Sequence, residues 1–548
     1  MKFNTFFVTV AAAAFFLLDS SSATPTGLTT RATNNKVIVG YFPNWLYGRY
    51  TPANIDFSKY THIVSINFAT SSPSIKPLTR RDNCAQYYAF AIQNTDTTPI
   101  WADSGLFDEY VQYGFPKLVS LAHAAGTKVM VSVGGWSGST HFSPMAASAS
   151  NRAAWIQWNV DFISKYGTDG VDIGELNFIC NHIPMTLIIK LDWEYPTAKG
   201  PGCNAVDDND VENLNTLVKE LRTALNSKFS SNYKEITMAV HISPFGGSTD
   251  VTDVSGFVPY VDRFHVMTFD VNGAWNSTSG PNAPFHSQPG YGYPYGFAEG
   301  IELWHAAGVP YNKLAGGIPF YGRAQTLNVS NDPNTQYNPA VSPTPPKGDS
   351  FDGSWTNQYC SKDTSDASGI WRWTNMRSQG LLSSPTTAAS PWIRHFDNIT
   401  QTPWLYNPKD KTFISYDDPT SLGVKTNFAL SKDIAGLFCW SVEQDNGELL
   451  DAIAPMIAGN SKPTPINSGT ASSAGVLTPT ASASYGTASP VPTSGAGCGS
   501  ASPWDVSTVY NSGNSVSYKG SLYKAQWWTQ GEIPGSSTWG SWKLVKAC

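Results

Sequence analysis

Charged side chains are scarce in this 548-residue chain, making up 14% of it, against about 25% in an average soluble domain. The formal net charge is −6 with no basic block, so a nucleic-acid partner is not expected. No membrane span is expected either. The first apolar run, Phe6–Leu18, has 13 residues, a span needs about 20, and no later segment is long and apolar enough.

Aromatic residues, by contrast, are abundant, and the number of cysteines is odd. Aromatics reach 13% of the chain and include 19 tryptophans. Many rings with few charges fit a protein that handles neutral, ring-shaped ligands such as sugars, although rings packed in a core account for the same composition. The seven cysteines cannot all pair within one chain, and in a secreted protein that calls for an explanation.

The N-terminus has the pattern of a secretory signal peptide. Met1-Lys2 is a short positive start, the apolar run follows, and Ser21-Ser22-Ala23 ends in a small residue suited to cleavage. We therefore expect residues 1–23 to be removed and the mature protein to be secreted and extracellular.

A compositional change near the C-terminus divides the rest of the chain. Residues 460–497 are almost all Ser, Thr, Pro, Ala and Gly, which cannot pack a core and predict an extended linker. The linker separates a large body, residues 36–459, from a tail, residues 498–548.

Short runs rich in Val, Ile, Leu, Met and Phe alternate with helical patterns along the body. Eight strands are predicted: Lys36–Phe42, His62–Phe68, Lys128–Val133, Gly170–Ile173, Ile236–His241, Arg263–Phe269, Lys313–Ile318 and Ile434–Trp440. Helical spacing is clearest over Asn151–Tyr166, Asp208–Phe229 and Phe297–Ala307.

Eight such alternations predict an α/β fold, a (β/α)8 TIM barrel with insertions. A doubly wound open sheet is the alternative, disfavoured because no Gly-x-Gly-x-x-Gly follows the first strand. Residues 324–401 are long, irregular and aromatic-rich, and predict a small α+β subdomain inserted after strand seven.

Barrels of this kind carry their chemistry at the carboxyl ends of the strands, and the fourth strand ends unusually. Asp169-Gly170-Val171-Asp172-Ile173 is followed by eighteen residues and then by Asp192-Trp193-Glu194-Tyr195-Pro196. Without residues 174–191, Asp172, Asp192 and Glu194 would alternate on one face of a strand. Their pKa values would be pushed apart, as general acid catalysis requires. A metal site is disfavoured because no His accompanies the cluster.

The joined motif resembles the Asp-x-x-Asp-x-Asp-x-Glu signature of glycoside hydrolase family 18, the chitinases. Further segments resemble the family's pattern in the same order, and they are Gly40–Trp45, Ser132–Trp136, Met267–Asp270, Pro319–Arg323 and Trp440.

The resemblance implies retaining, substrate-assisted hydrolysis of chitin or chitin oligosaccharides by a monomer, without cofactor or metal. Glu194 is then the general acid and base. Asp192 orients the substrate's acetamido group, whose oxygen is the nucleophile, and Asp172, hydrogen-bonded to Ser132, holds or shares the proton of Asp192. The implied substrate-binding residues are Tyr41, Ser132, Gly135, Trp136, Tyr195, Met267, Phe269, Asp270, Tyr321, Arg323 and Trp440, the last flooring the subsite where the bond breaks.

Phe269 departs from the family pattern, which usually has Tyr at this position. The missing hydroxyl normally donates a hydrogen bond to the acetamido carbonyl. Its loss in a dry site costs on the order of 1–3 kcal/mol, or roughly ten- to hundredfold in rate.

Residues 174–191 are interpreted as a retained intron translated in frame. Gly174-Glu175 can be encoded G|GTGAG and Leu191-Asp192 TTAG|AC, and splicing would restore one Asp codon. The segment also carries Cys180, so its removal leaves six cysteines. A genuine insertion loop is the alternative. Either Thr186–Leu191 replaces Gly170–Ile173 in the barrel or an excursion interrupts the strand, and both predict poor folding or inactivity.

The tail is similar to the small chitin-binding modules of secreted chitinases, which are three-stranded β units. Tyr523, Trp527 and Trp528 are expected to stack on sugar rings, although Trp527 is as well suited to a core position. A disulfide between Cys498 and Cys548 is expected to close so small a core.

Three functions stay open on the sequence. A secreted chitinase is the first, a non-catalytic chitin-binding lectin on the same barrel is the second, and an endo-β-N-acetylglucosaminidase is the third. Glu194 favours an enzyme over a lectin, and the tail favours chitin over N-glycans. Phe269 and the interruption are compatible with a lectin.

Overall fold

The computed structural model describes residues 36–43, 46, 49–66, 93, 95–100, 107, 110–173, 193, 196–197, 200, 202–245, 251–357, 359–460, 501–505, 508, 510, 513–525, 533–535 and 542–547. They belong to two compact units that divide between residues 472 and 473. Several predictions lie outside the described residues. These are the signal peptide, the linker over 461–497, the segment 174–191, the Cys498–Cys548 pair, and Asp192, Glu194, Tyr195, Trp527 and Trp528.

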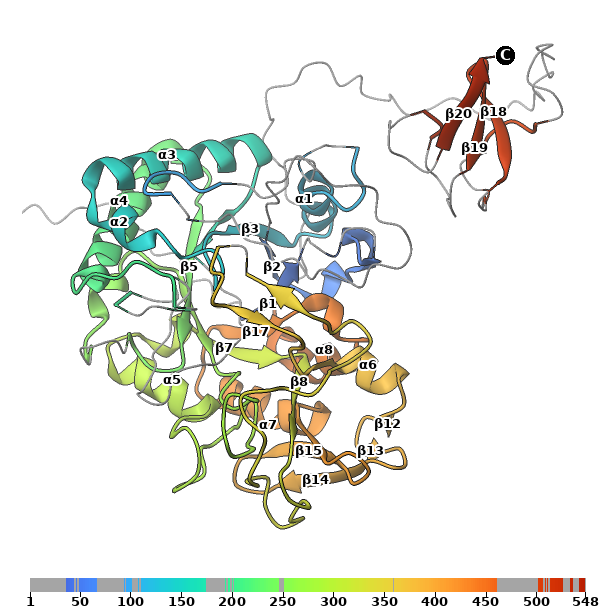
Figure 1. Cartoon of the computed structure of the whole chain (residues 1–548). Coiled ribbons are helices and arrows are strands. Elements are labelled where there is room, and N and C mark those ends of the chain that lie inside the picture. Colours follow the sequence, from blue (N-terminus) through green and yellow to red (C-terminus); the bar gives the residue numbers. More distant parts are fainter. Residues whose placement is uncertain are drawn as a thin grey trace, which may run out of the picture. The chain divides into compact units, whose positions relative to one another are not determined.

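Eight parallel strands of the first unit close into a barrel in the order β1-β17-β7-β6-β5-β4-β3-β2 (Figure 1). Every predicted strand is confirmed to within two residues at each end, and the open-sheet alternative is excluded. The bounds are β1 Val37–Pro43, β2 His62–Ile66, β3 Lys128–Ser132, β4 Gly170–Ile173, β5 Glu235–His241, β6 Arg263–Met267, β7 Leu314–Pro319 and β17 Gly436–Trp440. Gly170–Ile173 thus occupies the fourth barrel position, so replacement of this strand by Thr186–Leu191 is ruled out.

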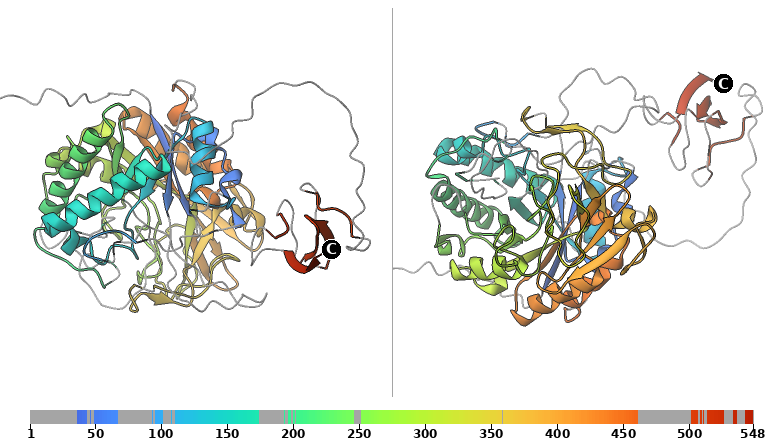
Figure 2. Two further views of the ribbon diagram at one scale, coloured as in Figure 1. Left: turned by 90° about the horizontal axis from the view of Figure 1, so that it is seen from above. Right: turned by 60° about the horizontal axis from the view of Figure 1, so that its bottom comes forward.

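Helices surround the barrel, and the strands lie inside them in both further views (Figure 2). The three predicted helices are confirmed as α3, α4 and α5. α4 buries Leu214, Val218, Leu221 and Leu225 at helical spacing. The bounds are α1 Phe115–Ala124, α2 Phe142–Ala147, α3 Ala149–Tyr166, α4 Asp210–Lys228, α5 Phe297–Ala306, α7 Pro419–Ser431 and α8 Glu448–Ile453.

The inserted subdomain is built on a five-stranded antiparallel sheet in the order β11-β8-β16-β15-β14. β8 begins at Tyr321, directly after Phe320, and β16 ends at Ser415, so the sheet extends beyond the predicted 324–401 on both sides. Its elements are β8 Tyr321–Thr326, β9 Trp355–Thr356, β10 Thr364–Ser365, β11 Ile370–Arg372, α6 Trp373–Ser378, β12 Leu382–Ser384, β13 Thr387–Ala388, β14 Ile393–Asp397, β15 Thr402–Asn407 and β16 Thr412–Ser415.

A buried ion cluster closes the amino-terminal end of the barrel. Glu235, the first residue of β5, accepts hydrogen bonds from Arg263 Nη2 at 2.5 Å and from Lys128 Nζ, and it lies 3.2 Å from His62 Nε2. Burial alone raises the pKa of the Glu235 carboxyl, but the attraction of Arg263, His62 and Lys128 outweighs burial and holds the pKa well below its usual range. Each of these four residues is the first of its strand.

The second unit contains a three-stranded antiparallel sheet, as the tail predicted. Its strands are β18 Ser515–Tyr518, β19 Ser521–Ala525 and β20 Trp542–Ala547. Tyr510, Val516, Ala525 and Trp542 form its small core, and Tyr523 is half-buried beside them. In neither unit do the described residues include a helix with the length and apolarity that crossing a membrane demands.

Candidate active site

Asp172, the next-to-last residue of β4, is surrounded by polar side chains from three other strands, β1, β5 and β6. The Tyr41 hydroxyl donates a hydrogen bond to Asp172 Oδ2 at 2.8 Å, and the Thr237 hydroxyl donates to Oδ1. His265 Nδ1 lies 2.9 Å from the Tyr41 hydroxyl and 3.8 Å from Asp172 Oδ1. Asp172, Thr237 and His265 are fully buried, and Tyr41 is nearly so.

Burial raises the pKa of Asp172 to about 6, against the opposing effect of the hydrogen bonds from Thr237 and Tyr41. Ser132 is the register partner of Asp172 across β3 and β4 and also lowers this pKa, but the two hydroxyls that bind the carboxyl closely are those of Tyr41 and Thr237. Burial together with the nearby Arg263 cation holds the pKa of His265 well below its usual range, so its imidazole is neutral. The site therefore keeps a carboxyl that can take up a proton near neutral pH.

Asp169, the first acid of the motif, has a structural role. Its Oδ2 accepts hydrogen bonds from His123 Nε2 at 2.8 Å and from the Val129 backbone N–H at 2.9 Å. Both donors precede or begin β3, so Asp169 fixes where β4 enters the barrel.

A second carboxylate, Asp270, follows β6 and is clamped by the insertion. Tyr321 donates a hydrogen bond to Asp270 Oδ1 at 2.8 Å, and Arg323 Nε donates to the same oxygen. The Arg323 guanidinium lies 4.9 Å from the ring centroid of Trp275. Asp270 has a φ of 57°, a left-handed conformation rare for a side-chain-bearing residue, which these contacts and the 3.1 Å hydrogen bond from its backbone N–H to Asn282 hold in place.

An aromatic layer covers the carboxyl-terminal end of the barrel. Tyr41 packs against Phe438 at 5.6 Å and Trp440 at 5.7 Å between ring centroids. Phe269 packs edge-on against Phe438 at 5.8 Å and Tyr321 at 6.5 Å. Because Phe269 is 5% exposed, the site is dry where the family's tyrosine hydroxyl is missing.

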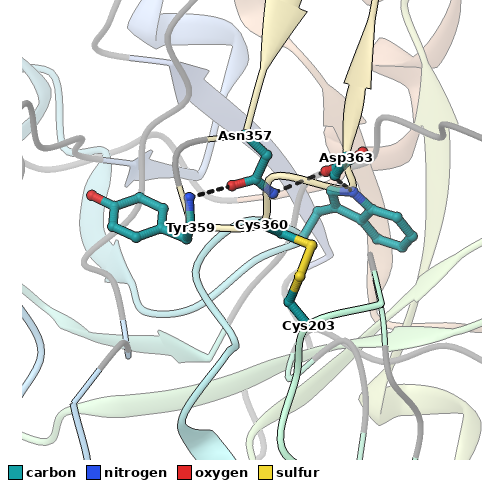
Figure 3. The surroundings of a disulfide bond; sticks show 6 residues. Cys203, Asn357, Tyr359, Cys360 and Asp363 are labelled. Carbon is teal, nitrogen blue, oxygen red and sulfur yellow. Dashed lines mark hydrogen bonds between the residues drawn. A yellow bond between two sulfur atoms is a disulfide. The ribbon is translucent and has the colours of Figure 1, made fainter.

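Trp136, which follows β3, is held by the insertion rather than by the barrel alone. Its Nε1 donates to Asp363 Oδ2 at 2.8 Å, and Asn357 Nδ2 donates to the same oxygen at 2.9 Å. Burial raises the pKa of Asp363 to about 7. A disulfide between Cys203 and Cys360, with Cα atoms 5.6 Å apart, links the loop between β9 and β10 of the insertion to the segment between β4 and α4 (Figure 3).

The predicted residues of the barrel site that the structure describes gather at the carboxyl-terminal end of the barrel, and Tyr523 lies in the second unit. Asp172, Tyr41, Ser132, Gly135, Trp136, Met267, Phe269, Asp270, Tyr321, Arg323 and Trp440 all lie at that end of the barrel and are all buried. The hydroxyl of Tyr41, which is predicted to bind substrate, donates a hydrogen bond to Asp172. Cys439, on β17, is a buried free thiol.

Thr237, His265, Asn357 and Asp363 were missed by the sequence reasoning. Alternation along β6 carries a signal for His265, which lies two residues before Met267, and Thr237 is the register partner of Asp172. No sequence signal points to Asp363, which reaches Trp136 across 227 residues. The described residues contain no cluster of three or more His, Cys, Asp or Glu suited to a metal ion.

The structure is thus a closed α/β barrel with a buried, protonatable carboxyl near the end of its fourth strand, together with a separate β module. The sequence model of glycosyl hydrolases family 18 matches residues 37–174 and 188–445. The model of carbohydrate-binding module family 5/12 matches residues 503–543. The chain therefore belongs to glycosyl hydrolase family 18 and ends in a family 5/12 carbohydrate-binding module.

Relatives with known names agree with this assignment. A chitinase-like effector of Moniliophthora roreri is 31% identical over 431 residues, covering 75% of this chain and 91% of that protein. Chitinase A1 of Niallia circulans is 28% identical over 480 residues, covering 80% of this chain and 63% of that protein.

Solved structures resemble the barrel unit. A chitinase from Rhizomucor miehei matches with a TM-score of 0.62 and 28% identity, over 77% of this chain and all of that one. The Group IV chitinase of Ostrinia furnacalis in complex with allosamidin matches with a TM-score of 0.59 and 26% identity, over 77% of this chain and 99% of that one.

Proposed function

We propose that this protein is a secreted chitinase that hydrolyses β-1,4-linked N-acetylglucosamine polymers with retention of configuration. The observation that carries the proposal is Asp172, whose buried carboxyl has a pKa of about 6 and lies at the carboxyl end of β4, directly before the interrupted part of the motif. The relatives named as chitinases and the 5/12 module support chitin as the substrate.

In the proposed mechanism, Glu194 protonates the glycosidic oxygen, and the bond to the leaving sugar breaks. The acetamido oxygen of the sugar that remains attacks its own anomeric carbon and forms an oxazolinium ion. Asp192 orients the acetamido group and balances the positive charge, and Asp172 holds or shares the proton of Asp192. Glu194 then takes a proton from water. The water attacks the anomeric carbon from the face that the leaving sugar occupied, which opens the oxazolinium ion with retention of configuration.

This mechanism requires Asp192 and Glu194 next to Asp172, so the proposal includes the absence of residues 174–191 from the working protein. The family match breaks after residue 174 and resumes at residue 188, which places the gap inside this segment. Sequencing the mature transcript tests the interpretation as an intron. A transcript that keeps the 54 nucleotides and yields active, secreted protein would contradict it.

The activity test uses the protein lacking residues 174–191 beside its Glu194→Gln variant. We expect hydrolysis of chitin oligomers by the first and loss of turnover in the second, and NMR of the first-formed product should show the β-anomer. Turnover that survives in Glu194→Gln, or an α-anomer formed first, contradicts the mechanism. Mass spectrometry of the secreted protein tests cleavage after Ala23.

A chitin-binding lectin on the same barrel is the second candidate. Phe269 favours it, because the buried site lacks the hydroxyl that the family's pattern places there. One relative, from Moniliophthora roreri, is named a chitinase-like effector rather than a chitinase. Tight binding of chitin oligomers without turnover by the deleted protein would establish the lectin.

A further inference from the structure

A line of three hydrogen-bonding groups crosses the interior of the barrel. Asp172 on β4, Tyr41 on β1 and His265 on β6 are joined through the Tyr41 hydroxyl, 2.8 Å from Asp172 Oδ2 and 2.9 Å from His265 Nδ1. The exposed fraction of each residue is 1% or less, so water does not compete for these contacts. The outer two members are on strands that are not neighbours in the barrel.

The surroundings of His265 decide which ring nitrogen carries the proton. Nε2 has no hydrogen-bond partner among the described residues. A buried N–H donor without an acceptor is costly, and the proton is therefore better placed on Nδ1, where it has the Tyr41 oxygen as its acceptor. The Tyr41 hydroxyl, receiving this hydrogen bond, then donates its own proton to Asp172 Oδ2, 2.8 Å away.

We propose that His265 is a positioning residue for the reaction: by donating to the Tyr41 oxygen it directs the Tyr41 proton onto Asp172 and so sets the pH at which Asp172 and Asp192 together hold one proton. The inference rests on the proposed function, because it assigns a role to the same acid pair. His265 does not touch substrate and acts only through Tyr41.

Four ionisable groups act on His265. Asp172 lies 3.8 Å from Nδ1, and the ring stacks on Phe438 at 5.2 Å. Arg263, on the same strand, disfavours a positive imidazole, as does His62, and Glu235 favours it. The effects of burial and of Arg263 on the pKa of His265 outweigh that of Glu235, so the ring stays neutral through the working pH range. A neutral ring with one proton fixed on Nδ1 is a permanent donor, which is what the proposed role requires.

Two variants in the protein lacking residues 174–191 separate positioning from packing. His265→Phe keeps a ring against Phe438 and removes the donor, whereas His265→Asn restores an N–H near the position of Nδ1. The acidic limb of the pH profile of kcat/KM reports the acid pair. We expect His265→Phe to move this limb to higher pH by about half to one pH unit, the size of one lost hydrogen bond. In His265→Asn the acidic limb should lie at the same pH as in the parent protein.

The outcomes distinguish this inference from the proposed function. If the parent turns over chitin oligomers and the acidic limb is unchanged in His265→Phe, the inference is wrong and the function stands. If the limb moves equally in both variants, His265 acts by packing alone, and the inference is again wrong.

A readout without turnover keeps the inference testable should the parent be inactive, in which case the proposed function fails by itself. The carboxyl carbon of Asp172 can be titrated by ¹³C NMR in the parent and both variants, assigned by its absence in Asp172→Asn. The midpoint should rise in His265→Phe and not in His265→Asn, and a midpoint that is the same in all three overturns the inference.

Discussion

Replacing Phe269 by Tyr should increase the rate at which this protein hydrolyses chitin oligomers. The ring of Phe269 lies between Phe438 and Tyr321 and is 5% exposed. A hydroxyl added at its edge would enter a dry site, where it could donate a hydrogen bond to the acetamido carbonyl of the substrate. That oxygen is the proposed nucleophile, so the hydroxyl would also fix its direction of attack.

The size of the gain follows from this burial. A hydrogen bond made by an otherwise unpaired group in a site without water contributes about 1–3 kcal/mol. At about 1.4 kcal/mol for each factor of ten, the gain in kcat/KM is about tenfold to a hundredfold. Most of it should be in kcat, because the acetamido group is held most tightly while it attacks.

Initial rates on soluble N-acetylated chitin oligomers measure the effect, in the background that lacks residues 174–191. Phe269→Leu is the matched control, because it changes the packing and adds no donor, and its rate should not rise. Equal rates for Phe269→Tyr and the parent, with equal melting temperatures, would refute the reasoning and show that another donor already holds the acetamido group.

Four further predictions concern stability, pH and the binding module. Cys203→Ser should lower the free energy of unfolding by about 2–5 kcal/mol, seen as a lower melting temperature, and an unchanged melting temperature contradicts a stabilising disulfide. Glu235→Gln leaves the buried Arg263 cation without its anion and should lower the free energy of unfolding by about 3–5 kcal/mol in chemical denaturation, and an unchanged midpoint would contradict this role of Glu235. Asp172→Asn removes an acid whose pKa is about 6 when folded and 3.8 as its ordinary value; because such an acid loses stability as pH rises from about 4 to 6, the variant should be more stable than the parent above pH 6 by about 3 kcal/mol and equal to it below pH 4. Equal melting temperatures at both ends of that range would falsify the raised pKa. Deleting residues 498–548 should reduce the rate on insoluble chitin about tenfold by lowering the local substrate concentration and leave the rate on soluble oligomers unchanged, and a fall on both substrates would point to a folding role for the module.

The barrel could be predicted from the sequence because its strands are buried on both faces. β1 is buried at every position and is a continuous apolar run rather than an alternating pattern. β5 and β6 are also buried at every position, but polar residues such as Thr237 and His265 alternate with their apolar ones. The edges of the insertion could not be predicted in the same way. A single residue, Phe320, separates the end of β7 from the start of β8, and no turn or change of composition marks the passage from barrel to insertion.

The acids of the site were found because they lie close together in the sequence, whereas their supporting residues were not. His265 reaches Tyr41 across 224 residues, and the contact exists only because the barrel closes with a particular register. The pairing of Cys203 with Cys360 spans 157 residues and has no spacing rule behind it. Sequence patterns report which face of a strand a residue occupies, but the residue it meets there is set by tertiary structure.

The closure of the barrel also determines when a nascent chain can become an enzyme. β1, the first strand that the structure describes, pairs on one side with β17, with Val37 opposite Gly436. Lys36 and Asn460 then fasten the seam with backbone-to-side-chain hydrogen bonds at 3.1 and 2.6 Å across 424 residues. Until the ribosome has passed Trp440, one edge of β1 stays unpaired in the growing chain, and an unpaired strand edge promotes aggregation. A truncated message therefore gives an open sheet rather than a weaker enzyme.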